Sequence, residues 1–316
     1  MNFPVFDLHC DTSLKLLAEK PAKGLRSNDL HIDLERARVL PGYAQCFASF
    51  TTTCEEMYPG SPSAEEVFKG ELAAITREIE ENKDLIQFAR SAEEIRRNFQ
   101  NGIMSAVLTI EGPAGFGFDS QRLKELYETG FRITTLSWNE DNPLTGSCVT
   151  QGGLKEQGKV YLKEAQQLGM VVDVSHLSDA GFWDIMELTE KPIIASHSNS
   201  RTICNVSRNL TDEMYLAICR SGGTVGITQC RGFIGGNYDV DSFCDHIFHF
   251  LQLAGSDKHI SLGGDMDGCP VLAEEVLGIE DYSKIAVRLL ERGLSEETVH
   301  RIFWDNALEV MEKCAV

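Results

Sequence analysis

The residues of this sequence that could do chemistry lie at the ends of short apolar runs. The first run ends in His9 and Asp11, which are two residues apart, so on an extended chain both side chains leave the same face. A later run ends in Glu111, and a buried carboxylate is costly unless a cation or a metal ion meets it. Such residues can bind zinc, but each motif alone also fits a hydrogen-bonded pair or a salt bridge.

Two further apolar runs both end in Ser-His, which places His176 and His197 at corresponding positions. Parallel strands bring their carboxyl ends to one rim, where the active sites of barrel enzymes lie. Together with His9, Asp11 and Glu111 these histidines form a ligand set that suits zinc or a similar divalent ion. A second ion ~3.5–4 Å from the first would need a bridging carboxylate, a role that Glu111 could fill.

The last apolar run leads into Gly263-Gly264-Asp265-Met266-Asp267-Gly268. At that rim Asp265 could be a metal ligand, a general base or a helix cap. If Glu111 bridges two ions, Asp265 remains free for proton transfer.

The elements that must position these residues follow from the alternation of apolar runs with amphipathic stretches. Short runs that do not alternate strictly are typical of strands buried on both faces, and the longer stretches between them predict α-helices. We expect strands at Val5–His9, Ala44–Phe50, Met104–Ile110, Phe131–Leu136, Met170–Val174, Pro192–Ala195, Thr224–Thr228 and His259–Leu262. We expect helices at Ser63–Asn82, Gln121–Thr129, Glu156–Leu168, Ser178–Leu188, Asp212–Ser221, Asp241–Ala254, Asp281–Arg292 and Ser295–Phe303.

Eight strands separated by helices in 316 residues predict an α/β fold, a (β/α)8 TIM-type barrel that forms one domain over residues 1–316. An open doubly wound sheet is the structural alternative. The long interval 51–102 between the second and third strands predicts a helical segment beyond the simple repeat.

Charge and hydropathy exclude several classes of partner. The formal net charge is −19, whereas nucleic acids and anionic membranes bind basic surfaces. The N-terminus has no basic segment followed by an apolar one, and no run approaches the ~18 apolar residues of a membrane span. Ten scattered cysteines without a CxxC pair are then expected to be reduced, and we expect a cytoplasmic protein.

Over its whole length the chain resembles the membrane (renal) dipeptidase family of zinc peptidases, in its bacterial cytosolic type. The motifs that carry the resemblance occur in the family's order. They are Asp7-Leu8-His9-Cys10-Asp11, Ile110-Glu111-Gly112, Asp173-Val174-Ser175-His176, Ala195-Ser196-His197-Ser198, Arg208-Asn209-Leu210-Thr211-Asp212 and Gly263-Gly264-Asp265-Met266-Asp267-Gly268.

The resemblance implies a barrel enzyme with two Zn²⁺ ions per chain, or other divalent ions in their place. One ion would be held by the first-strand pair, the other by the two Ser-His histidines, and Glu111 would bridge them. A hydroxide shared by the ions would attack the peptide bond of a dipeptide, with Asp265 as the acid/base. Arg208 would bind the free C-terminal carboxylate, for which the guanidinium fork is suited. Family members are often dimers, so a homodimer is implied as well.

Two departures from the family pattern bear on substrate choice. Many members carry a histidine at the fourth strand end, where this chain has Trp138 followed by Asn139; an indole N–H can donate a hydrogen bond but cannot accept a proton. At the seventh strand end, Cys230 and Arg231 replace a usual aromatic. We expect Trp138, Asn139 and Arg231 to contact substrate, and Arg231 to favour acidic side chains. A related metal-dependent amidohydrolase or lactonase and a non-catalytic binding protein remain alternatives.

Overall fold

Eight short strands, rich in β-branched and aromatic residues, pair in parallel and form the centre of the protein. The computed structural model describes residues 3–54, 58 and 62–315, so the start of the N-terminus, at residues 1 and 2, lies outside the described residues. The barrel strands are β1 (Val5–Cys10), β2 (Tyr43–Phe50), β4 (Met104–Glu111), β5 (Phe131–Thr135), β6 (Val171–Asp173), β7 (Ile193–Ile194), β8 (Val225–Ile227) and β9 (Ile260–Leu262).

The strand order confirms the predicted barrel. The strands run β7-β6-β5-β4-β2-β1-β9-β8, and all named pairings are parallel. A parallel bridge between Ala195 and Val225 joins the two ends of this order, so the sheet closes at β7 and β8. The open doubly wound alternative is therefore wrong, because an open sheet would leave these two edges apart.

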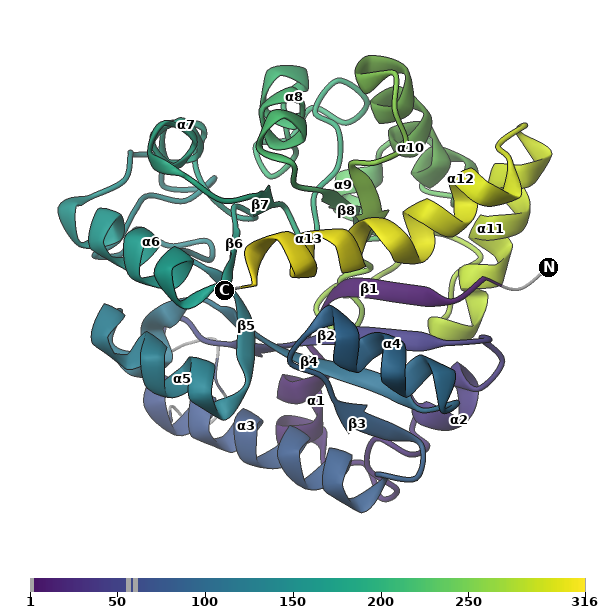
Figure 1. Cartoon of the computed structure of the whole chain (residues 1–316), viewed down its shortest axis with the longest axis horizontal. Coiled ribbons are helices and arrows are strands. Elements are labelled where there is room, and N and C mark those ends of the chain that lie inside the picture. Colours follow the sequence, from purple (N-terminus) through teal and green to yellow (C-terminus); the bar gives the residue numbers. More distant parts are fainter. Residues whose placement is uncertain (1–2, 55–57, 59–61, 316) are drawn as a thin grey trace.

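Helices surround the strands and connect them (Figure 1). The helices that overlap the ranges predicted from the sequence are α3 (Ala64–Glu81), α5 (Leu123–Thr129), α6 (Glu156–Leu168), α7 (Asp179–Leu188), α8 (Asp212–Ser221), α10 (Val240–Ala254), α11 (Tyr282–Glu291) and α12 (Glu296–His300). The helices that were not predicted individually are α1 (Thr12–Glu19), α2 (Leu34–Ala37), α4 (Ala92–Gln100) and α9 (Arg231–Ile234). Helix α3 begins at a capping box, in which Ser63 and Glu66 bond each other's backbone N–H.

The interval 51–102 contains α3, α4 and a short strand, β3 (Ile86–Phe88). Strand β3 pairs with the start of β4, where Ile86 lies opposite Met104, and so lies off the barrel path.

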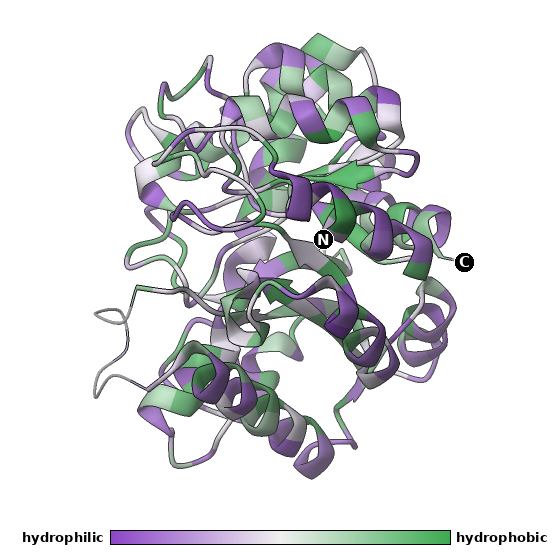
Figure 2. Cartoon of the chain, turned by 90° about the vertical axis from the view of Figure 1, so that its left-hand side faces the viewer, coloured by the Kyte–Doolittle hydropathy of each residue, from purple (hydrophilic) through white to green (hydrophobic). Residues whose placement is uncertain are grey.

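The C-terminal helix α13 (Asn306–Cys314) crosses the barrel and packs against its apolar interior (Figure 1). One buried cluster combines Phe6, Val107 and Ile133 of the strands with Leu308 and Met311 of α13. Hydrophobic residues concentrate on the strands, whereas the helices alternate hydrophobic and hydrophilic faces (Figure 2). Within the described part of the chain, no helix combines the length and apolarity needed to cross a membrane.

Candidate active site

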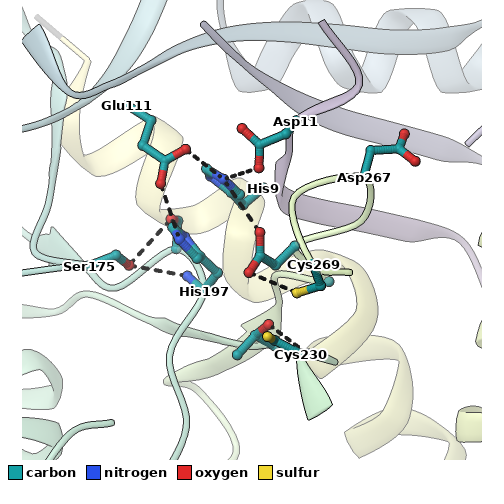
Figure 3. Close-up of polar contacts among 12 residues, drawn as sticks. His9, Asp11, Glu111, Ser175, His197, Cys230, Asp267 and Cys269 are labelled. Carbon is teal, nitrogen blue, oxygen red and sulfur yellow. Dashed lines mark hydrogen bonds and ion pairs between the residues drawn. The ribbon is translucent and has the colours of Figure 1, made fainter. Parts of the chain in front are cut away.

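Glu111 lies at the centre of a group of buried histidines at the carboxyl ends of the strands. As the last residue of β4, it directs Oε2 toward His9 of β1, whose Nε2 is 3.2 Å away. Its other oxygen, Oε1, lies 2.9 Å from His176 Nε2 and 3.6 Å from His197 Nε2. The two oxygens of this carboxylate thus face different imidazoles, Oε2 facing His9 and Oε1 facing His176 and His197 (Figure 3).

Two aspartates complete the His9 side of this group. Asp11 Oδ2 lies 3.4 Å from His9 Nε2, and Asp265 Oδ1 lies 4.0 Å from it. Ligand atoms within 4.8 Å of one another come from His9, Glu111 and His197 in one set and from His9, Asp11 and Asp265 in another, so each set could hold a metal ion. Among the described residues, His9 Nε2 and Asp11 Oδ1 are buried without a hydrogen-bond partner, and a cation could satisfy both.

Two hydrogen bonds determine which ring nitrogen of His176 and of His197 carries the proton. The side-chain oxygen of Asn139 lies 2.9 Å from His176 Nδ1, and because it can only accept, this nitrogen carries the proton. The Ser196 hydroxyl donates to Asp173 and lies 2.6 Å from His197 Nδ1, which therefore donates to it. These contacts leave the two Nε2 atoms, which lie 2.9 Å apart, as the ring nitrogens available to a metal ion.

Burial sets the charges of these groups. It lowers the pKa of His176 and of His197 well below the usual value, and nearby cations lower them further, so both rings are neutral. Burial raises the pKa of Glu111 to about 7 and that of Asp265 to about 6, with His9 opposing both shifts. Burial acts against a charged His9, but Glu111 and Asp11 outweigh it and raise the pKa of His9. A cation is thus favoured beside these carboxylates.

The loop after β9 holds Asp265 in the left-handed region, at φ 56°, and Asp267 at φ 67°. A side chain at Gly268 would collide with the carboxylates of Asp11 and Asp265, so this close approach requires glycine. Asp267 points away from the histidines (Figure 3), accepting from the Thr12 hydroxyl at 2.6 Å and from a backbone N–H at 2.7 Å. It fastens the loop to the start of α1.

A cavity of about 350 Å³ opens onto these residues, near the lower end of the ~300–1,000 Å³ typical of ligand pockets. Trp138 and Asn139, which the sequence predicts to contact substrate, both line it, and Trp138 packs against Phe50 with ring centres 4.9 Å apart. Lys15 and Cys269 also line it and were not predicted. Lys15 lies in the first turn of α1, four residues after Asp11, and no sequence signal pointed to it because α1 itself was not predicted.

The sequence predicts that Arg208 and Arg231 contact substrate, but neither is among the described residues that line the cavity. Arg208 is buried behind His197, donating to the Ser198 hydroxyl at 2.7 Å and to the His197 carbonyl at 2.9 Å, while its Nε has no hydrogen-bond partner among the described residues. Arg231 turns toward the Tyr238 ring, 5.9 Å from its centre, and its neighbour Cys230 faces the cavity instead. Their predicted contacts with substrate stay predictions.

Comparison with known proteins assigns the family. The sequence pattern of membrane dipeptidase, peptidase family M19, matches residues 1–316. The chain belongs to this family. It is accordingly a metallo-dipeptidase, a hydrolase, and membership implies a metal cofactor. All the motifs quoted above fall inside the matched region.

Relatives span bacteria and fungi. The chain is 30% identical over 268 residues to an uncharacterized protein in the pqqA 5′ region of Klebsiella pneumoniae, covering 80% of this chain and 97% of that protein. It is 28% identical to dipeptidase tcpJ of Claviceps purpurea, with 76% of this chain matching 58% of that protein.

Solved structures share the fold. A Rhodobacter sphaeroides metallopeptidase, liganded with a phosphinate mimic of the dipeptide L-Ala-D-Ala, superposes with a TM-score of 0.90 at 23% identity, covering 99% of this chain and 100% of that one. The probable dipeptidase PvdM of Pseudomonas aeruginosa gives a TM-score of 0.89 at 17% identity, with coverage of 99% and 95%.

Proposed function

We propose that this enzyme is a zinc-dependent dipeptidase that cleaves dipeptides with a free C-terminal carboxylate. Two Zn²⁺ ions would be held at the rim, one by His9 and Asp11 and the other by His176 and His197, with Glu111 shared between them. The observation that carries the proposal is the position of Glu111, whose two oxygens lie 3.2 Å from His9 Nε2 and 2.9 Å from His176 Nε2.

The donor set fits zinc. It consists of imidazole nitrogens and carboxylate oxygens, which zinc accepts in catalytic sites. The rings of His176 and His197 are neutral, with Nε2 available, because Asn139 and Ser196 engage their other nitrogens. Zinc bound here would also satisfy the Nε2 of His9, which has no hydrogen-bond partner among the described residues.

The chain's own residues supply the proton transfers. When bound, the ions would polarise the peptide carbonyl and make the attacking water more acidic. Asp265 then accepts a proton from that water and donates it to the nitrogen of the leaving amine. Burial raises the pKa of Asp265 to about 6, close enough to neutrality for one carboxyl to act in both directions.

Binding and orientation fall to residues around the cavity. Arg208 attracts the C-terminal carboxylate of the substrate, since its buried positive charge reaches the site and lowers the pKa of Asp265. Trp138 forms an apolar wall with Phe50 and offers an indole N–H to the substrate. The small cavity volume favours a dipeptide over a longer chain.

A dipeptide panel tests the proposal. We expect the zinc-loaded enzyme to cleave Ala-Ala and to lose most activity when the C-terminus is amidated. L,D dipeptides belong in the panel because the Rhodobacter sphaeroides structure holds an L-Ala-D-Ala mimic. Glu111→Gln and Asp265→Asn should each reduce kcat by about 100-fold or more, as loss of a ligand or of proton transfer does.

The negative outcomes are informative. If the enzyme binds two zinc ions but cleaves no dipeptide, the substrate is another small amide or ester, such as an N-acyl amino acid or a lactone. If it cleaves dipeptides and the Asp265→Asn variant keeps its kcat, the assignment of the acid/base is wrong.

A further inference from the structure

Two cysteines that the proposed reaction does not use flank Asp265. Cys269, four residues further along the same loop, donates its thiol to Asp265 Oδ2 at 3.0 Å. Cys230, which precedes α9, lies near Cys269 (Figure 3), and the two Sγ atoms and an Asp265 oxygen all lie within 4.8 Å of one another. Both cysteines are free thiols and line the active-site cavity, so solutes that enter it can reach them.

Two sulfurs and one carboxylate oxygen at this separation form a cation site of a different character from the histidine centre. With a zinc–sulfur bond of roughly 2.3 Å, two thiolates on one tetrahedral ion lie roughly 3.8 Å apart, within the observed spacing. Thiolates select thiophilic ions, whereas the donors around Glu111 are nitrogen and oxygen.

We propose that Cys230, Cys269 and Asp265 form a third metal site, specific for a thiophilic divalent cation such as Cd²⁺ or surplus Zn²⁺, and that its occupancy inhibits the enzyme. Binding converts both thiols to thiolates and releases their two protons to solvent, without any change of oxidation state. The fourth position of a tetrahedral ion stays open to water.

Inhibition follows from the two directions in which Asp265 faces. Oδ1 lies 4.0 Å from His9 Nε2, on the side of the catalytic centre, and Oδ2 lies 3.0 Å from Cys269. An ion on the cysteine side withdraws electron density from this carboxylate and fixes its orientation, so it no longer accepts a proton from water. This consequence rests on the proposed role of Asp265, but the binding of the ion does not.

Cadmium titration of the zinc-loaded, phosphine-reduced enzyme tests the site. Thiolate ligands give Cd²⁺ a charge-transfer absorption in the ultraviolet that imidazole and carboxylate ligands do not give, so the signal separates this site from the histidine centre. We expect one additional ion per chain by elemental analysis, a band that saturates with it, and a fall in kcat of about 100-fold, the scale of lost proton transfer.

Two variants complete the design. Cys230→Ser together with Cys269→Ser should abolish the band, the extra ion and the cadmium inhibition, each compared with the same protein before cadmium is added. Cys54→Ser, which removes an exposed thiol, should leave all three unchanged. Circular dichroism and zinc content of the double variant check that it is folded and retains its other ions.

The outcomes separate the two parts of the proposal. No band in the wild type, or an equal band in the double variant, would overturn the site. A band that depends on both cysteines without loss of activity would overturn the inhibitory role. Because neither band nor stoichiometry needs a substrate, both can be read even if the dipeptidase assay fails.

Discussion

Replacement of Glu111 by glutamine should separate the cost of burying this carboxylate from its value as a ligand. Burial raises the pKa of Glu111 from its ordinary 4.5 to about 7 in the folded chain. A carboxyl with a raised pKa contributes stability that is fully present below its unfolded pKa and is lost as the pH rises through the folded pKa. Glutamine has nearly the same shape and stays neutral, so it avoids this loss.

The magnitude follows from the two pKa values. By linkage, the metal-free variant should exceed the metal-free wild type in free energy of unfolding by about 1.5 kcal/mol at pH 5.5 and about 3 kcal/mol at pH 8. Saturating zinc should make the wild type more stable than the variant. An ion at 100 times its Kd stabilises the folded wild type by about 2.7 kcal/mol per site, and the variant binds the ion more weakly.

Urea unfolding at both pH values, with chelator or with zinc, provides the measurement. Far-ultraviolet circular dichroism and the fluorescence of the three tryptophans should give coincident transitions. A metal-free variant that is no more stable than the wild type at pH 8 would refute the assigned burial cost. An equal stabilisation of both proteins by zinc would refute the role of Glu111 as a shared ligand.

Four further substitutions test the surroundings of the site. Arg208→Lys keeps the charge but not the fork, and should lower kcat/KM for free dipeptides by about 10–100-fold with little effect on amidated ones, as steady-state kinetics can measure. Asn139→Ala frees the His176 Nδ1 proton, and should weaken zinc binding by about 10–100-fold in a chelator competition while kcat at saturating zinc falls far less. If Arg231 selects acidic side chains, Arg231→Ala should lower the ratio of kcat/KM for Ala-Asp to that for Ala-Ala; if Lys15 does so from the cavity wall, Lys15→Ala will lower it instead.

The barrel could be predicted from sequence because each of its strands leaves a local signal. All eight expected strands appear, most within one or two residues of their predicted bounds, since runs of buried apolar residues are hard to place elsewhere. Helices α6 and α8 match their expected ranges. Helix α1 was missed because its eight residues begin directly after the motif at the end of β1.

The convergence of the histidines was also predictable. In a parallel barrel, the carboxyl ends of all strands lie at the same rim. Residues at these ends, here His9, Glu111, His176 and His197, are therefore expected to lie close together. What the sequence does not encode locally is how loops fold over that rim. The contact of Asn139 with His176 spans 37 residues, and nothing in the run from Trp138 to Asn142 indicates which side chain turns inward.

The difference between residues held by strands and residues held by loops is important for Asp265. The proposed metal ligands around Glu111 lie on or next to paired strands, in a register that aligns Glu111 with Phe50 of β2, so their spacing is fixed by the barrel. Asp265 and Cys269 lie on a loop held by left-handed residues and by a bond from the Cys269 N–H to the Asp265 carbonyl at 3.0 Å. Changes in such a loop can alter the donors beside Asp265 without disturbing the histidine centre. Asp265, the proposed acid/base, is therefore the residue through which the proposed third, sulfur-based metal site can act on the catalytic rim.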